Sequence, residues 1–64
     1  MKVGYDRDAD LISFILSDAP VEESDEERPG LILDFDVRGN VVALEVDASK
    51  RIGNPMSVEY AIAR

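Results

Sequence analysis

PGLILDFDVRGNVVALEVD, residues 29–47, is the stretch that decides the fold. It holds two apolar runs on either side of an Arg-Gly pair. Within each run, apolar side chains recur at every second residue, which is the period of a strand with one buried face. The stretch therefore predicts an antiparallel β-hairpin that serves as the scaffold of the protein.

Two registers of this hairpin compete. A three-residue loop, 37–39, would pair Leu31 with Glu45, whereas a two-residue loop, Arg38-Gly39, gathers six apolar side chains on one face. The shorter loop forces Arg38 to positive φ, a strain on the order of 1 kcal/mol. Burial of each large apolar side chain contributes about 1.5–3 kcal/mol, so we predict the two-residue turn. Its apolar pairs are Leu31 with Val46, Leu33 with Leu44, and Phe35 with Val42.

The chain before the hairpin supplies further strands. Apolar residues alternate with polar or small ones over 1–5, and 11–17 is rich in strand-forming Ile and Phe. Residues 21–28 carry five acidic side chains and one apolar residue, which is typical of a solvated loop or a charged edge strand. We expect a sheet of four to five short strands.

The connection between the first two strands contains Asp6, Asp8 and Asp10, a spacing that resembles a calcium-binding loop. Such a loop needs glycine at its sixth position and glutamate at its twelfth, and here those positions hold Leu11 and Ser17. Aspartate side chains also accept hydrogen bonds from nearby backbone N–H groups and favour turns. The sequence therefore predicts a structural turn.

Residues 47–52 read as a short helix. Asp47 is a suitable N-cap, Lys50 and Arg51 lie at the end that favours cations, and Gly53 can terminate the helix. Asn54-Pro55 then suits the start of a second helix. We expect the tail, residues 53–64, to be helical, although Val58, Tyr60 and Ile62 would equally suit an edge strand.

The predicted fold class is α+β. It consists of a small antiparallel β-meander sheet of 4–5 short strands with a short helix and a helical C-terminal tail. Residues 1–64 form one domain, with a β-rich core over 1–52 and the tail over 53–64.

Composition limits how so small a domain is stabilised and what it binds. A chain of 64 residues buries only about 60% of its unfolded surface, and the absence of cysteine excludes disulfides. We therefore expect a homo-oligomer, with a dimer as the favoured form. The net charge of -7 opposes direct nucleic-acid binding and suits a basic partner protein. No run approaches the roughly 20 apolar residues of a membrane span, and we expect a cytoplasmic protein with no membrane contact.

A group of three carboxylates is the one candidate site for chemistry. In the preferred register Asp34, Asp36 and Glu45 point to the face opposite the main apolar set, where carboxylates can hold Mg²⁺ or Ca²⁺ or exchange protons. A solvated sheet face is the favoured interpretation, so we assign no catalytic residue, no cofactor and no firm metal ligand. Asp34, opposite small Ala43, is expected to be partly buried and to accept hydrogen bonds near the helix start.

These features occur in an order that resembles a family of small, mainly prokaryotic proteins, domain of unknown function 2283, over about residues 1–52. The resemblance implies a compact β-rich fold and no established activity, and some members look like the smaller half of toxin–antitoxin-like pairs. Arg38 departs from the Asp that the family pattern has before the turn glycine, which bears on the turn geometry. The matching residues are Tyr5, Asp6, Ala9, Asp10, Pro29, Gly30, Ile32, Asp34, Asp36, Gly39, Val41, Glu45, Asp47, Ala48 and Ser49.

We therefore expect a non-enzymatic protein–protein interaction module, with an antitoxin-like role as one form of it. A self-associating structural domain is the first alternative, and a divalent-metal or small-ligand binder the second. The partner-binding strip predicted for the interaction module consists of Glu22, Glu23, Asp25, Glu26 and Glu27.

Overall fold

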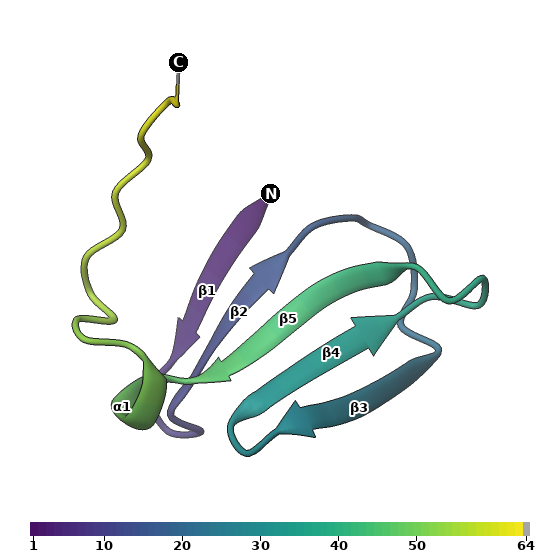
Figure 1. The fold of residues 1–64 in the computed structure, drawn as a ribbon, viewed down its shortest axis with the longest axis horizontal. Helices are drawn as coiled ribbons and strands as arrows, with labels where there is room; N and C mark the ends of the chain where they lie inside the picture. Colours follow the sequence, from purple (N-terminus) through teal and green to yellow (C-terminus); the bar gives the residue numbers. More distant parts are fainter. Residues whose placement is uncertain (64) are drawn as a thin grey trace.

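The computed structural model describes residues 1–63, which form one open antiparallel sheet and a single short helix (Figure 1). The sheet has the strand order β1-β2-β5-β4-β3. The class is therefore mostly β, with less helix than predicted. The elements are β1 (Lys2–Asp6), β2 (Leu11–Ile15), β3 (Glu23–Arg28), β4 (Leu31–Phe35), β5 (Val41–Asp47) and α1 (Ala48–Arg51).

The strand order corrects the predicted meander. Strands β3, β4 and β5 do follow one another as a meander, but β5 then pairs with β2 on its other side. The connection 16–22 must therefore cross the ends of β5 and β4 to reach β3 at the far edge (Figure 1). Alternation along one strand predicts which face is apolar, but it does not say which strands are neighbours.

The central hairpin combines the predicted pairing of its strands with the three-residue loop, which was the less favoured of the two predicted turns. Leu31 pairs with Val46 and Leu33 with Leu44, as predicted. The register then shifts at a bulge, so that Phe35 pairs with Val41 and not with Val42. A β-bulge places one extra residue in one strand and absorbs a change of register.

The turn itself is a three-residue loop, because the Asp36 N–H donates to the Asn40 carbonyl at 2.9 Å and closes residues 37–39. Gly39 takes the positive φ of 84°, whereas Arg38 stays out of that region. The predicted two-residue turn is therefore wrong, and the longer loop avoids the strain that it would have placed on Arg38.

Helix α1 begins as predicted and is joined to the first turn of the sheet. The Asp47 side chain accepts from the Lys50 N–H at 2.9 Å, which makes Asp47 the N-cap. Asp10, at φ 58°, accepts from the Ala48 N–H through its carbonyl and from the Ser49 hydroxyl through its carboxylate. The Asp10 side chain of the first turn therefore bonds to the chain itself, as expected for a structural turn.

Gly30 brings the β3–β4 turn against the same helix. Its φ of +79° is unfavourable for residues with a side chain, and a Cβ at this position would lie 2.9 Å from the Cβ of Asp47. The Asp47 N–H donates to the Gly30 carbonyl at 2.9 Å, and Arg51 Nε donates to the Pro29 carbonyl at 3.0 Å. The Pro-Gly pair therefore holds the start and end of α1 against the sheet.

The predicted helical tail is not observed. One turn forms at Asn54, whose side chain accepts from the Met56 N–H at 3.1 Å, and residues 58–63 then run on without helix (Figure 1). So short an isolated helix is marginal in water, and β-branched Val58 and Ile62 with aromatic Tyr60 disfavour it further. In the part of the chain that the structure describes, no helix is long and apolar enough to span a membrane.

Candidate functional site

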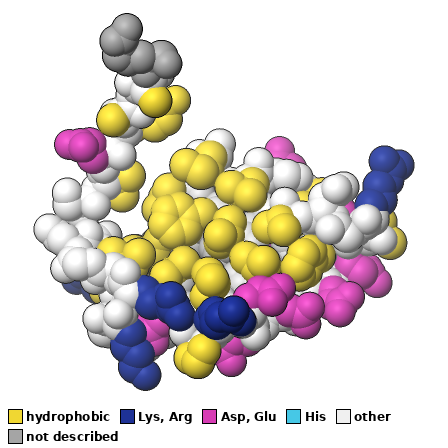
Figure 2. Space-filling view, in the orientation of Figure 1, with side chains coloured by type: hydrophobic (Ala, Val, Ile, Leu, Met, Phe, Trp, Pro, Cys, Tyr) yellow, Lys and Arg dark blue, Asp and Glu magenta, His cyan; other side chains and the backbone are white. Residues whose placement is uncertain are grey.

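The larger of the two candidate sites is an apolar face of the sheet. Cross-strand partners lie on the same face, so the register assigns one set of large apolar side chains to a single side. Figure 2 shows this side as a broad hydrophobic area over the middle of the sheet. We call it the apolar face; it consists of Val3, Tyr5, Ile12, Phe14, Leu31, Leu33, Phe35, Leu44 and Val46.

The apolar face is poorly covered by the chain itself. Of its members only Ile12 is fully buried, at 3% exposure, and no large side chain of the described residues is completely buried. The segment after α1 approaches the face at Val3, Ile12 and Phe14, but a cavity of about 260 Å³ remains between them. The sheet is therefore a single layer, whereas stable domains pack at least two layers around a core.

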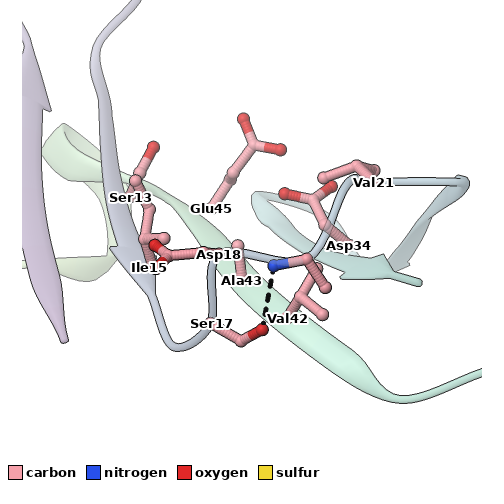
Figure 3. Close-up of a pocket in the computed structure, with 10 residues that line it drawn as sticks. Ser13, Ile15, Ser17, Asp18, Val21, Asp34, Val42, Ala43 and Glu45 are labelled. Atoms are coloured by element: carbon pink, nitrogen blue, oxygen red, sulfur yellow. Dashed lines mark hydrogen bonds between the residues drawn. The ribbon is translucent and has the colours of Figure 1, made fainter.

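The second candidate site is a cavity of about 390 Å³ on the opposite, polar face. Ser13, Asp34 and Glu45 point to the same side of the sheet here (Figure 3). The crossing connection supplies the rim through Ser17, whose Oγ accepts from the Ala19 N–H at 3.1 Å. The chain thus covers part of its polar face and leaves most of its apolar face open.

Asp34 is the buried member of this cavity. It lies opposite Ala43, as predicted, and its side chain is only 5% exposed. Its carboxylate accepts from Ser24 Oγ of β3 at 2.5 Å. The expectation that Asp34 accepts hydrogen bonds near the start of α1 is wrong, because the donor is Ser24, its cross-strand partner on β3.

Glu45 lies beside Asp34, and the two carboxyl groups influence one another. A hydrogen bond with Asp34 raises the pKa of Glu45, and burial and the negative charge of Asp34 raise it further. Glu45 therefore holds a proton more tightly than an isolated glutamate does. Such a pair can exchange a proton with solvent or with a bound molecule.

Asp36 does not join this pair, so the predicted three-carboxylate group is not assembled. It lies in the hairpin turn and accepts from the N–H groups of Arg38 and Asn40, both at 2.9 Å. The backbone bond from Asn40 lowers the pKa of Asp36 most; partial desolvation opposes the shift, and bonds from the Asn40 side chain, Arg38 and Gly39 reinforce it. Among the described residues, no group of three or more acidic side chains is placed to hold a metal ion.

The acidic strip lies on and just before β3, the edge strand of the sheet. All six residues of Glu23–Arg28 are exposed. The register places Glu23 and Asp25 beside the apolar face, and Glu26 on the other side, where its carboxylate accepts from the Gly30 N–H at 3.3 Å. The five predicted partner-binding residues thus surround one edge and do not form one flat patch.

Comparison with known families now places the chain. The model of the family described as protein of unknown function (DUF2283) matches residues 2–49, from the start of β1 into α1. The chain belongs to this family. No curated protein and no solved structure matches it. The DUF2283 match includes the whole sheet and ends before the tail.

Sequence reasoning missed the groups that surround the DUF2283 carboxylate pair. Ser24 reaches Asp34 only because β3 folds beside β4, and Ser13 approaches Glu45 only because β2 folds beside β5. Ser13 and Ser24 each alternate with the side chains of the opposite face in their own strand. The face of each serine could therefore be predicted, but its neighbours could not be predicted without the strand order. The contact between Asp10 and Ser49 was missed for the same reason.

Proposed function

We propose that this DUF2283 protein is a non-enzymatic interaction module that works as a homodimer, with the apolar faces of two copies packed together. The observation that supports this most is the single-layer sheet with nine large apolar side chains on one side, of which one is fully buried. A second sheet laid over that face would give a β-sandwich, in which side chains from two inner faces interdigitate.

The surface area of the chain argues for a partner of this size. The chain exposes 5128 Å² for a mass of 7.1 kDa, against roughly 4,100 Å² expected for a compact monomer. The excess of about 1,000 Å², to which the extended segment 54–63 also contributes, is comparable to the ~800 Å² that each partner buries in a standard protein interface. A second copy supplies such a surface without any further component.

The distribution of charge permits two copies to meet in this way. The chain carries -7 overall, but on this side of the sheet the charged side chains Glu23, Asp25 and Arg28 belong to the edge strand β3 and lie beside the apolar face. Figure 2 shows the acidic side chains along the border of the apolar area. Face-to-face packing keeps these charges at the rim, where water screens their repulsion.

Sedimentation equilibrium over a range of protein concentrations tests the proposal. We expect a species of twice 7.1 kDa at micromolar concentration, with a thermal midpoint that rises as protein concentration rises. A folded monomer at those concentrations would overturn the proposal. Far-UV circular dichroism on the same samples establishes whether the chain is folded.

A second candidate function is docking of a basic partner protein on the acidic strip, including the antitoxin-like role. The supporting observation is that β3 is a sheet edge whose six side chains are all exposed. At low salt, the protein should retain a stoichiometric basic partner from a lysate of the source cell. A variant with Glu23, Glu26 and Glu27 changed to Gln should lose that partner, and equal retention by both would reject this role.

Binding of a divalent metal or a small ligand by Asp34 and Glu45 remains the third candidate. The cavity and the paired carboxylates favour it, although a third acidic ligand is not placed beside them among the described residues. Calorimetric titration with Mg²⁺, Ca²⁺ and Mn²⁺ tests it directly. A flat trace for all three ions rejects this reading.

A further inference from the structure

The C-terminal arm, residues 54–63, lies beyond the family match, which ends at residue 49. Its large apolar side chains stand at every second position: Met56, Val58, Tyr60 and Ile62. This is the period of a strand with one apolar side. Tyr60 is 86% exposed and Ile62 84% exposed, so the arm presents this pattern to solvent.

We propose that the arm of one copy adds as a sixth strand to the free edge of β1 in the second copy, and that the two copies exchange arms symmetrically. The inference rests on the proposed homodimer and adds a second contact to it. Addition of a strand to an exposed sheet edge is a common mode of recognition, in which main-chain hydrogen bonds supply affinity and alternate side chains supply specificity.

The outer part of the arm forms no strand with its own chain, although Val58 and Glu59 line the cavity beside Val3. Its root is fixed by the Asn54 turn and by Arg7, whose guanidinium donates to the Met56 sulfur at 3.7 Å. Beyond Ser57, within the described residues, the arm makes no backbone hydrogen bond to the sheet. It extends away from the body of the molecule (Figure 1). Unpaired backbone groups and exposed apolar side chains on one segment are what an exchanged strand would satisfy in a second copy.

The two free edges of the sheet, β1 and β3, differ in how well they suit the arm. Glu59 is the only charged residue of positions 54–63, and β3 would place it against a row of acidic side chains. The β1 edge instead offers Lys2, with Arg7 just beyond the strand, and carries a single acidic residue, Asp6, at its end. Opposite charges beside one another favour β1, whereas like charges across a strand pair disfavour β3.

The alternation of the arm also fits the face that β1 contributes. If Val58 or Tyr60 pairs with Val3, the apolar side of the arm continues the apolar face. Glu59 then lies on the other side of the sheet, which is also the side of Lys2. A slip by one residue would reverse both placements, so the pattern specifies the register to within steps of two.

Cysteine cross-linking tests the exchange, because the chain has no cysteine of its own. Two double variants, Val3→Cys with Val58→Cys and Val3→Cys with Tyr60→Cys, sample the two registers. Oxidised glutathione accepts the hydrogens of the two thiols as the disulfide forms. In the register that the dimer uses, paired Cα atoms lie about 4.5–5.5 Å apart, within disulfide range.

We expect one of the two variants to run as a covalent dimer on a non-reducing denaturing gel. The matched control, Val3→Cys with Glu59→Cys, places the second thiol on the opposite side of the arm and should cross-link at least tenfold less. A covalently closed monomer would mean that the arm pairs with its own β1, and it would overturn the exchange. No cross-link in either variant would overturn it as well.

Failure of the exchange is distinguishable from failure of the proposed homodimer. If sedimentation finds a dimer for the unmodified chain but no variant cross-links between copies, the apolar-face dimer stands and the arm exchange falls. If sedimentation finds a folded monomer, both fall. Circular dichroism of each variant before oxidation confirms that the substitutions have left the sheet intact.

Discussion

The two faces of the sheet are made by the same strands but differ in what lies over them. The polar face carries small and charged side chains, and the crossing connection 16–22 covers Asp34 and Ala43 there. The apolar face carries the large side chains, and only the segment after α1 approaches it. The long connection therefore covers a carboxylate pair, and the face with more apolar surface receives less cover from the chain.

This difference separates two kinds of stability. Each large side chain on the apolar face can contribute about 1.5–3 kcal/mol when it is buried, and in the proposed dimer that contribution depends on protein concentration. The polar face is complete within one chain, and its contributions depend on pH through Glu45 and on one hydrogen bond to Asp34. Substitutions on the two faces should therefore have effects of different size and different kind.

The largest effect is expected for Leu44→Glu, in the middle of the apolar face between Phe14 and Leu33. The variant should lose about 3 kcal/mol of unfolding free energy or more, because it removes buried apolar area and places a charge in the proposed interface. Urea unfolding at fixed protein concentration and sedimentation measure the two consequences.

Val37→Glu is the matched control for this substitution. Val37 is 79% exposed in the hairpin loop, away from the apolar face, so the same new charge should change stability by no more than about 0.5 kcal/mol. Because Leu44→Glu could unfold the chain outright, Leu44→Thr serves as a milder variant, since β-branched threonine favours strands. Normal stability and a normal dimer in both Leu44 variants would refute the role of the face.

The next largest effect is expected on the polar face, for Ser24→Ala. This variant leaves the buried Asp34 carboxylate without its donor, at a cost of about 1–3 kcal/mol. Asp34→Ala should cost less, because Ser24 is exposed and can bond to water, and because the repulsion on Glu45 disappears. Urea unfolding of the two variants decides the order; a larger loss for Asp34→Ala would contradict this account of the pair.

The apolar face was predictable from the sequence, and the reason is local. Alternation in residues 31–35 and 41–47 fixed which side chains share a face, and the N-cap at Asp47 fixed where the sheet ends. Local rules also failed at one point within this hairpin. A bulge beside the turn allows the favoured register and an unstrained Arg38 to occur together.

The carboxylate site was only half predictable, because it depends on strands that are distant in the chain. The sequence singled out Asp34 and Glu45, but it could not place Ser24 or the connection 16–22 around them. It also grouped Asp36 with them, since in the predicted register Glu45 pairs with Ile32, whose side chain shares a face with Asp34 and Asp36. The loop that closes at Asn40 draws Asp36 into the turn instead.

A smaller effect is expected for Glu45→Gln, and it should depend on pH. The folded state raises the pKa of Glu45 above its ordinary 4.5, so it binds a proton more tightly than the unfolded chain does. That contribution to stability is complete below the ordinary pKa and is lost as pH rises through the raised one. At pH 7 the variant should therefore be more stable than the unmodified chain, by at most about 1 kcal/mol.

Urea unfolding from pH 4 to pH 8 measures this difference, and the gain of the variant should grow with pH across that range. Glu22→Gln, at an exposed position just before β3, is the matched control and should show no such growth. A Glu45→Gln variant that is less stable at neutral pH would show that the charge of Glu45 is stabilising, contrary to the geometry of the pair.

The smallest effect is expected for Asp36→Asn, where the sign of the pH dependence is reversed. Hydrogen bonds from the turn lower the pKa of Asp36 below its ordinary 3.8, so its contribution is present above that value and is lost as pH falls through the lowered one. At neutral pH the variant should have a lower urea midpoint than the unmodified chain, and the two midpoints should converge as the medium is acidified. Asp8→Asn, at an exposed position of the first turn, controls for the loss of one negative charge. A midpoint difference that persists in acid would mean that Asp36 acts through its shape and not through its charge. The contrast between Asp36 and Glu45 would then rest only on how deeply each side chain is buried.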